Sequence, residues 1–222
     1  MVTATRPRFE RSVKRAVVFD LDGTLIDSRE DIAAAANVAR QAIGLHALPM
    51  ATVVSYVGDG AEKLIERLTP GSAASQRTLA MDAFKAHYGT HCCDATKPYP
   101  GILQALSTLT ASGWQLGVAT NKPTAFAQVI LDHLGLSRWL PVVVGGDGAK
   151  KPDPASVQAV LSRLGSTGAV SWMVGDHHTD IQAGRAAGCR IMWCRWGIGE
   201  RQDLPVDAEA DSASSMTTLL NS

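Results

Sequence analysis

The chain has 222 residues, and its 21 lysines and arginines balance its 21 aspartates and glutamates. This length allows one large domain, or a core with a smaller domain, to bury a hydrophobic core without a partner. The balanced charge gives no indication of a nucleic acid partner, and no window reaches the roughly 18 uncharged apolar residues of a membrane span. We therefore expect a soluble monomer or homodimer with no nucleic-acid or membrane partner.

The cysteines bear on the compartment in which the protein works. Cys92, Cys93, Cys189 and Cys194 have spacings that match neither a zinc module nor the disulfide framework of a small secreted domain. The apolar run after the basic N-terminal segment, AVVF, is too short for the core of a signal peptide. We expect reduced thiols and a cytoplasmic protein.

Short runs rich in valine, isoleucine and tryptophan recur along the chain, without the alternation of half-exposed strands. Runs of this kind are typical of strands that are buried on both faces. Helical patterns lie between them, such as PTAFAQVILDHLG, where Gly135 would end the helix. The runs are 16–21, 115–120, 140–146, 171–176 and 190–195. Strands that alternate with helices predict an α/β fold, a Rossmann-like parallel sheet with helices on both faces.

The alternation breaks after the first strand, because residues 28–97 carry helical patterns only. Ser28, followed three residues later by Asp31, has the form of a capping box, and apolar residues then repeat at helical spacing. A long helical segment between two strands of one sheet predicts a small all-helical cap. Its hinges are expected near Asp27 and the TKPYPG segment.

These patterns divide the chain into four expected parts. Residues 1–13 form a flexible N-terminal extension, 14–27 and 98–206 the α/β core, and 28–97 the helical cap. Residues 207–222, which include the polar stretch DAEADSASS, form a C-terminal tail that is disordered or ends in a short helix.

Polar residues gather at the expected carboxyl ends of the strands, where ligands bind in parallel α/β sheets. Asp20 and Asp22 lie one residue apart, and two such close charges need a cation, an opposing lysine or a shared proton. The residues at these ends are Asp20, Asp22, Thr120, Asn121, Lys151, Asp176 and Asp180. The sequence therefore predicts a site at this edge of the sheet.

The motifs DLDGT, TN, KKPDP and GDHHTD, in this order, resemble those of the haloacid dehalogenase superfamily. The resemblance is to the branch of Mg-dependent small-molecule phosphatases with a helical cap after the first strand, and it covers roughly residues 14–200. It implies a hydrolase of phosphomonoesters that acts through an aspartyl-phosphate intermediate. It also implies that Mg²⁺ is held by the Asp20 carboxylate, the Asp22 backbone carbonyl and Asp176.

The resemblance also implies roles for the other residues. Asp20 would be the nucleophile, and Asp22 the general acid that later serves as a base. Thr120 and Asn121 would donate hydrogen bonds to the phosphoryl oxygens from the hydroxyl and from amide or backbone groups. Lys151 would neutralise the charge of the nucleophile and the phosphate.

Three further assignments follow from the same motifs. Lys151 is chosen over Lys150 because the lysine of the family directly precedes a proline, which leaves Lys150 as an exposed neighbour. Asp180 lies one helical turn after Asp176 and would contact the metal shell through water or orient Lys151. The family often has serine where this chain has His177, so a small hydroxyl contact would be lost or replaced.

Two histidines and two cysteines are weighed against metal or redox roles. Adjacent histidines rarely bind one ion together, so His177 and His178 are expected near the substrate entrance rather than at a zinc site. Cys92 and Cys93 are expected at the end of a cap helix rather than at a reactive site.

The cap sequence bears on the substrate. SYVGDGAEKL, with Gly58, Asp59 and Gly60, resembles the turn between cap helices in the bacterial phosphoglycolate phosphatase subfamily, and GTLIDSREDI is also similar to that subfamily. Glycines there would let backbone N–H groups and a helix start approach a small anion. The resemblance implies that 2-phosphoglycolate is hydrolysed to glycolate and phosphate.

Other functions stay open from the sequence. GDHHTDIQAGRAAG also resembles proteins that act on sugar phosphates, so N-acetylmuramate 6-phosphate, pyrophosphate or a phosphomutase reaction are alternatives. The non-enzyme alternatives are a phospho-accepting receiver and a silent binding module. The DLDGT order and the helical insert favour the hydrolase over the receiver, and the complete set of acids argues against a silent module.

Overall fold

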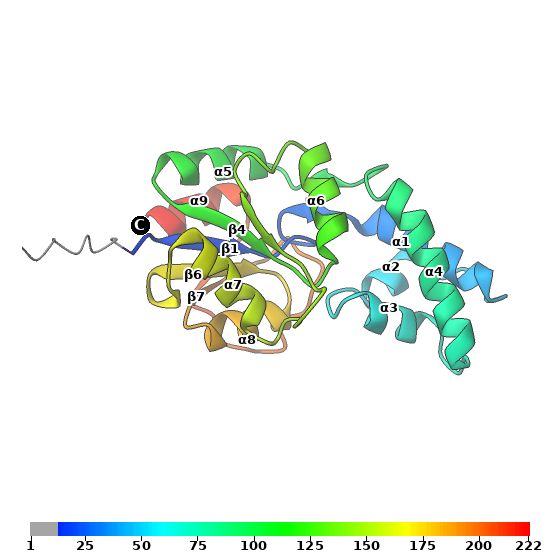
Figure 1. Cartoon of the computed structure of the whole chain (residues 1–222). Coiled ribbons are helices and arrows are strands. Elements are labelled where there is room, and N and C mark those ends of the chain that lie inside the picture. Colours follow the sequence, from blue (N-terminus) through cyan, green and yellow to red (C-terminus); the bar gives the residue numbers. More distant parts are fainter. Residues whose placement is uncertain (1–12) are drawn as a thin grey trace, which may run out of the picture.

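A six-stranded parallel sheet lies at the centre of the computed structural model, which describes residues 13–222 (Figure 1). In spatial order the strands are β5 (Val142–Val144), β4 (Gln115–Ala119), β1 (Ala16–Phe19), β6 (Ser171–Gly175), β7 (Arg190–Cys194) and β8 (Ala208–Ala210). The register places Ala16 of β1 beside Gln115 of β4 and Ser171 of β6. Strands β1 and β6 are buried along their whole length, which explains their lack of alternation.

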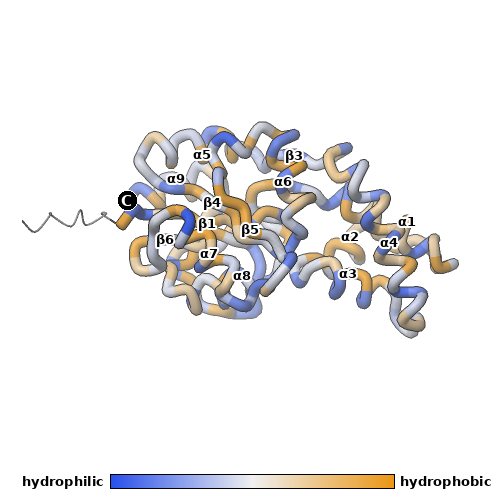
Figure 2. The backbone as a smooth tube through the Cα atoms, in the orientation of Figure 1, coloured by the Kyte–Doolittle hydropathy of each residue, from blue (hydrophilic) through white to orange (hydrophobic). Residues whose placement is uncertain are grey.

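Helices cover both faces of this sheet. Val17 and Phe19 of β1 point to one face and pack in a core cluster with α5 (Ile102–Ala111), α6 (Thr124–His133) and α9 (Ala213–Asn221). Val18 points to the other face, toward α7 (Ala155–Leu164) and α8 (His178–Ala186). Apolar residues concentrate along β1, β4 and β5 between these layers (Figure 2). The predicted α/β fold class is therefore confirmed.

A group of helices, here called the helical insert, lies between β2 (Ile26–Asp27) and β3 (Lys97–Pro98), beside the sheet (Figure 1). Its members are α1 (Arg29–Ala42), α2 (Met50–Val54), α3 (Ala61–Leu68) and α4 (Ala74–His91). Strands β2 and β3 pair antiparallel, so the two crossings of the chain into and out of the insert are joined. The predicted helical insertion after the first strand is thus present.

The capping box predicted at the start of the insert is wrong. The Ser28 hydroxyl donates instead to the Asp22 carboxylate over 2.5 Å. The buried Asp31 carboxylate accepts hydrogen bonds from the backbone N–H groups of Ala95 and Thr96 and from the Thr96 hydroxyl. Both side chains have partners outside the first turn of α1, where the chain enters and leaves the insert.

The predicted strands extend too far at their carboxyl ends. The observed strands stop before Asp20, Thr120 and Asp176, so these side chains lie on loops at the edge of the sheet. Of the expected N-terminal extension, 1–13, all but Val13 lies outside the described residues.

Disorder is the wrong expectation for residues 207–222, which are ordered and end in a helix. Ala208–Ala210 adds strand β8 to the sheet beside β7, and α9 follows. Met216 and Leu220 of α9 are buried in the core, and Trp114 donates its indole N–H to Asn221 over 3.0 Å. Sparse apolar residues at the right spacing are enough to hold a segment that is polar on average. No helix among residues 13–222 has the length and apolar character needed to cross a membrane.

Candidate active site

A buried lysine bridges two carboxylates at the carboxyl end of the sheet. Lys151 Nζ lies 2.7 Å from Asp20 Oδ1 and 2.6 Å from Asp180 Oδ1. Asp20 follows β1 directly, and Asp180 lies in the first turn of α8, where its other oxygen accepts the His177 backbone N–H. Burial alone would lower the pKa of Lys151, but the two carboxylates outweigh it and raise that pKa above its ordinary value. The lysine is therefore a fixed cation beside the expected nucleophile.

Asp176 lies in a tight cradle after β6. The Thr24 hydroxyl donates to its Oδ1 over 2.8 Å, and the backbone N–H groups of Ile198 and Gly199 donate to its Oδ2 over 2.8 and 2.9 Å. Gly23 has a φ of +85°, and a Cβ there would stand 2.1 Å from Asp176 Oδ2. The Asp22–Gly23 segment therefore packs against the Asp176 carboxylate, and only glycine fits at this contact.

The carboxylates of the site carry more negative charge than Lys151 can neutralise. Burial raises the pKa of Asp20 to about 6, and the neighbouring Asp180 adds to this while Lys151 opposes it. Burial also raises the pKa of Asp176 to about 7, with further contributions from Asp20 and Asp180. A cation bound among these groups would remove this repulsion.

The donor set fits a hard divalent ion. Asp20, Asp176 and Asp180 each offer an oxygen atom, and these atoms lie within 4.8 Å of one another. Carboxylate and carbonyl oxygens are the ligands that Mg²⁺ prefers. Asp180 accepts hydrogen bonds from Lys151 and the His177 N–H, while Asp20 and Asp176 also line the cavity. Asp20 and Asp176, with the Asp22 carbonyl in the adjoining loop, are therefore the residues that would hold the ion.

Thr120 and Asn121, the predicted phosphate-binding residues after β4, differ in which of their hydrogen-bonding groups are already used. Thr120 Oγ1 accepts the Lys122 backbone N–H over 3.2 Å, and no residue in the described part of the chain accepts its hydrogen, which is available to donate. The Asn121 carboxamide donates to the carbonyls of Gly58 and Lys151 and accepts the Lys151 backbone N–H. Both amide hydrogens of Asn121 are therefore already used, and its side chain positions the loops on either side instead of facing a phosphate.

Asp22 is held from two sides. One carboxylate oxygen accepts the Ser28 hydroxyl, and the other lies 3.0 Å from Lys122 Nζ. Ser28 belongs to the entrance of the helical insert, and Lys122 to the loop after β4. These contacts fix the orientation of the carboxylate that is expected to exchange protons with the substrate.

Lys122 is a site residue that the sequence reasoning missed. Its Nζ also donates to the hydroxyl of Tyr88 on α4 over 2.7 Å and lies 4.7 Å from the centre of that ring. Burial alone would lower the pKa of Lys122, but Asp22 and Tyr88 outweigh it and raise that pKa. The one available signal was its place directly after Thr120 and Asn121 at a strand end.

The loop of the insert that contains Gly58, Asp59 and Gly60 borders the site, and its two glycines are the residues of the three that lie next to it. Gly58 and Gly60 line the cavity described below, and α3 begins directly after Gly60. A Cβ at Gly58, whose φ is +128°, would stand 2.5 Å from His177 Nε2. The Asp59 carboxylate does not line the cavity, since it pairs with Arg67 over 2.5 Å.

The histidine pair lies at the contact between the insert and the core. His177, whose pKa burial lowers to about 4, directs Nδ1 to the Thr179 hydroxyl over 2.9 Å. Asp59, His177 and His178 offer ligand atoms within 4.8 Å of one another, but the ion pair with Arg67 already occupies Asp59. Cys92 follows α4, as expected for the end of a cap helix, and Cys93 comes next with a pKa that burial raises to about 11.

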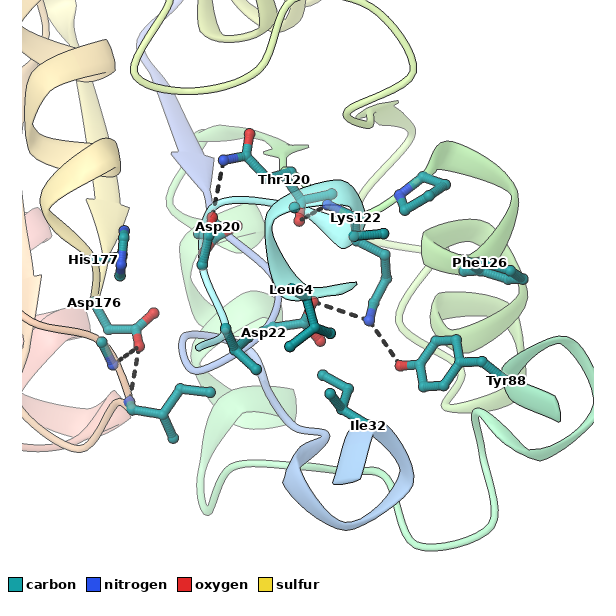
Figure 3. Close-up of a pocket in the computed structure, with 18 of the residues that line it drawn as sticks. Asp20, Asp22, Ile32, Leu64, Tyr88, Thr120, Lys122, Phe126, Asp176 and His177 are labelled. Atoms are coloured by element: carbon teal, nitrogen blue, oxygen red, sulfur yellow. Dashed lines mark hydrogen bonds and ion pairs between the residues drawn. The ribbon is translucent and has the colours of Figure 1, made fainter. Parts of the chain in front are cut away.

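One cavity joins these groups and opens between the sheet and the insert (Figure 3). Figure 3 shows Asp20, Asp22, Thr120 and Asp176 on one side, and Lys122 pointing between Asp22 and Tyr88. Apolar side chains form much of the remaining wall, namely Ile32, Val57, Leu64, Phe84, Pro123, Phe126 and Ile198. The cavity therefore has charged side chains at one end and apolar side chains along most of its remaining wall.

The parallel sheet with a helical insert after its first strand is the architecture of a family of hydrolases. The chain belongs to the haloacid dehalogenase-like hydrolase family, whose model matches residues 17–194. The expectation of family membership is therefore confirmed.

Relatives with names and solved structures agree with this membership. The chain is 35% identical over 209 residues to a phosphoglycolate phosphatase of Aquifex aeolicus, covering 93% of this chain and 97% of that protein. It is 36% identical over 213 residues to a plasmid-encoded phosphoglycolate phosphatase of Cupriavidus necator, covering 92% of each. A crystal structure from Haemophilus somnus, described as a predicted phosphoglycolate phosphatase, has a TM-score of 0.85 and 27% identity, covering 92% of this chain and 96% of that one.

Proposed function

We propose that the chain is a Mg²⁺-dependent phosphomonoesterase that hydrolyses 2-phosphoglycolate through an aspartyl-phosphate intermediate. The observation that carries the proposal is the placement of Lys151 between Asp20 and Asp180, next to the cavity that Asp20 and Asp176 line. In this proposal residues 14–27 and 98–206 form the catalytic core, and residues 28–97 form a cap over it.

The nucleophile is Asp20. Lys151 holds its Oδ1, which leaves the other carboxylate oxygen to attack phosphorus. The new bond between Asp20 and phosphorus forms as the bond from phosphorus to the ester oxygen breaks. The aspartyl-phosphate is then hydrolysed separately, so one difficult step is divided into two. Asp20, Asp176 and the Asp22 carbonyl would hold Mg²⁺, which when bound supplies positive charge that lowers the repulsion between carboxylate and phosphate.

Asp22 moves the proton. As the ester oxygen departs, the protonated Asp22 carboxyl donates its proton to it, and the alcohol is released. The resulting carboxylate then removes a proton from the water that attacks the aspartyl-phosphate, which regenerates Asp20 and releases phosphate. The Thr120 hydroxyl donates to a phosphoryl oxygen during both steps.

The substrate assignment rests on the relatives and on the cavity wall. Relatives at 35 and 36% identity carry the name phosphoglycolate phosphatase. A sugar phosphate would place several hydroxyl groups against a wall that is mostly apolar, with side chains such as Leu64 and Phe126, so most of these hydroxyl groups would lack a hydrogen-bond partner. The apolar wall therefore favours a small leaving group over a sugar. The four free thiols accord with a cytoplasmic location, which we also propose.

The experiment is phosphate release with Mg²⁺ across 2-phosphoglycolate, N-acetylmuramate 6-phosphate, other sugar phosphates and pyrophosphate. We expect 2-phosphoglycolate to lead in kcat/KM by about tenfold or more, equivalent to about 1.4 kcal/mol of selective transition-state binding. Asp20→Asn is the control, and loss of the nucleophile should lower kcat by at least about a thousandfold. A leading sugar phosphate would overturn the substrate, and an active Asp20→Asn variant would overturn the covalent mechanism.

A further inference from the structure

Lys122 is a buried cation in the wall of the cavity. Of the described residues that line the cavity, it is the only lysine or arginine. It is 8% exposed and lies where the core meets the helical insert, between Asp22 and Tyr88. A cation removed from water in this way attracts an anion more strongly than one on the surface.

Lys122 and Tyr88 together retain hydrogens for a ligand. Among the described residues, two of the three Lys122 donors have partners, Asp22 and Tyr88, and the third has none. The Tyr88 hydroxyl accepts from Lys122, and no described residue accepts its own hydrogen. Burial raises the pKa of Tyr88, which keeps this hydrogen in place. Two neighbouring donors of this kind match the two oxygens of a carboxylate.

The position of Lys122 relative to Asp22 determines which part of a substrate it meets. In the proposed mechanism Asp22 protonates the ester oxygen, and Lys122 is 3.0 Å from that carboxylate. A charged group a short way beyond the ester oxygen therefore comes within reach of Lys122. The side chains around it, among them Ile32 and Phe126, are apolar, so Lys122 and Tyr88 are the polar contacts in this part of the wall, and a carboxylate binds them more strongly than a neutral hydroxyl does.

From these contacts we infer that Lys122, with the Tyr88 hydroxyl, determines specificity by binding a carboxylate on the leaving group. The inference rests on the proposed phosphomonoesterase function and deepens it. It defines the substrates as phosphate esters of short hydroxy acids, and it assigns to Lys122 a contact with substrate in addition to its contact with Asp22.

The experiment compares two esters that differ in this group. 2-Phosphoglycolate carries the carboxylate, and 2-hydroxyethyl phosphate carries a neutral hydroxyl in its place. The variant Lys122→Met removes the charge and keeps the length of the side chain. We expect the ratio of kcat/KM for the two esters to fall by roughly 10- to 100-fold, as loss of a charge-assisted hydrogen bond requires.

The ratio isolates specificity from the contact with Asp22, because any effect on proton transfer changes the rates for both esters. Lys85→Met is the matched control, since Lys85 is an exposed lysine of α4, three residues before Tyr88. Its ratio should equal that of the wild type. Tyr88→Phe is a second test that leaves the lysine in place, and it should lower the ratio by a smaller factor and raise KM for 2-phosphoglycolate.

The outcomes separate the inference from the function on which it rests. A wild type that hydrolyses neither ester overturns the proposed function. A wild type that hydrolyses both equally well leaves a phosphatase and overturns the inference. The inference also fails if the wild type prefers 2-phosphoglycolate but the Lys122→Met and Tyr88→Phe variants keep the wild-type ratio.

Discussion

Asn121 and Gly58 are joined by a hydrogen bond of 2.9 Å from the Asn121 side-chain Nδ2 to the Gly58 carbonyl. The same carboxamide makes two hydrogen bonds with the backbone of Lys151. One side chain therefore connects the helical insert, the loop after β4 and the loop that carries the buried lysine. Positioning of the insert and positioning of Lys151 are coupled through it.

Replacing Asn121 with alanine should weaken both the fold and the site. The carbonyls and N–H group that it pairs lose their partners, and a buried unpaired polar group costs about 1–3 kcal/mol. We expect the free energy of unfolding in urea to fall by about this amount and KM to rise, because the loop at Gly58 is no longer held. Unchanged stability and unchanged KM would show that the carboxamide does not hold these loops together.

Asp22→Asn should slow turnover while leaving substrate binding largely intact. An amide can neither donate a proton as an acid nor accept one as a base, and general acid–base catalysis contributes roughly 10²–10⁴ in rate. We expect kcat to fall within this range and KM to change little, measured by steady-state phosphate release. A kcat within twofold of the wild type would remove Asp22 from proton transfer.

The two adjacent lysines should respond very differently to methionine. Lys151→Met leaves Asp20 and Asp180 without their cation, and breaking a buried ion pair costs about 3–5 kcal/mol. Lys150 pairs with Glu62, whose side chain is 69% exposed, and such surface pairs contribute at most about 1 kcal/mol. The measurements are denaturant unfolding and kcat for both variants, Lys151→Met and Lys150→Met. A large loss of activity in Lys150→Met would mean that Lys150, and not Lys151, is the lysine of the active site.

The raised carboxylate pKa values predict how stability depends on pH when no divalent ion is present. In the folded chain the pKa of Asp20 is raised to about 6 and that of Asp176 to about 7, above their ordinary value of 3.8. Between about pH 4 and pH 7 the folded state therefore binds more protons than the unfolded state, so these groups stabilise the fold less as pH rises. In EDTA, the Tm of the wild type should therefore fall relative to that of Asp176→Asn as the pH rises from about 4 to about 7. Thermal unfolding of both proteins across this range is the measurement.

Magnesium should reverse this trend, because a divalent ion binds the ionised carboxylates and a ligand of the folded state stabilises it. We expect saturating Mg²⁺ to raise Tm more at about pH 8 than at about pH 5, and to raise that of Asp176→Asn much less. Thermal unfolding with and without the ion provides the measurement. Equal shifts at both pH values would place the ion away from these carboxylates.

The sequence alone was sufficient for the features that depend on local pattern. Buried strands that alternate with helices define a parallel sheet, and the carboxyl ends of such strands meet at one edge. For that reason Asp20, Thr120, Lys151 and Asp176, far apart in the chain, could be expected to lie together. The choice of Lys151 over Lys150 came from the resemblance to the family, in which the lysine directly precedes a proline.

Only the tertiary structure decided which partner each polar side chain has. Asn121 bonds backbone groups in two distant loops, Lys122 meets Tyr88 from the insert, and Asp59 pairs with Arg67 instead of facing the cavity. The tail after residue 207 is ordered because its few apolar residues find a core to enter. Hydrogen bonds and ion pairs form within a few ångströms, so they depend on how the insert and the loops pack together, and no local pattern in the chain records that packing.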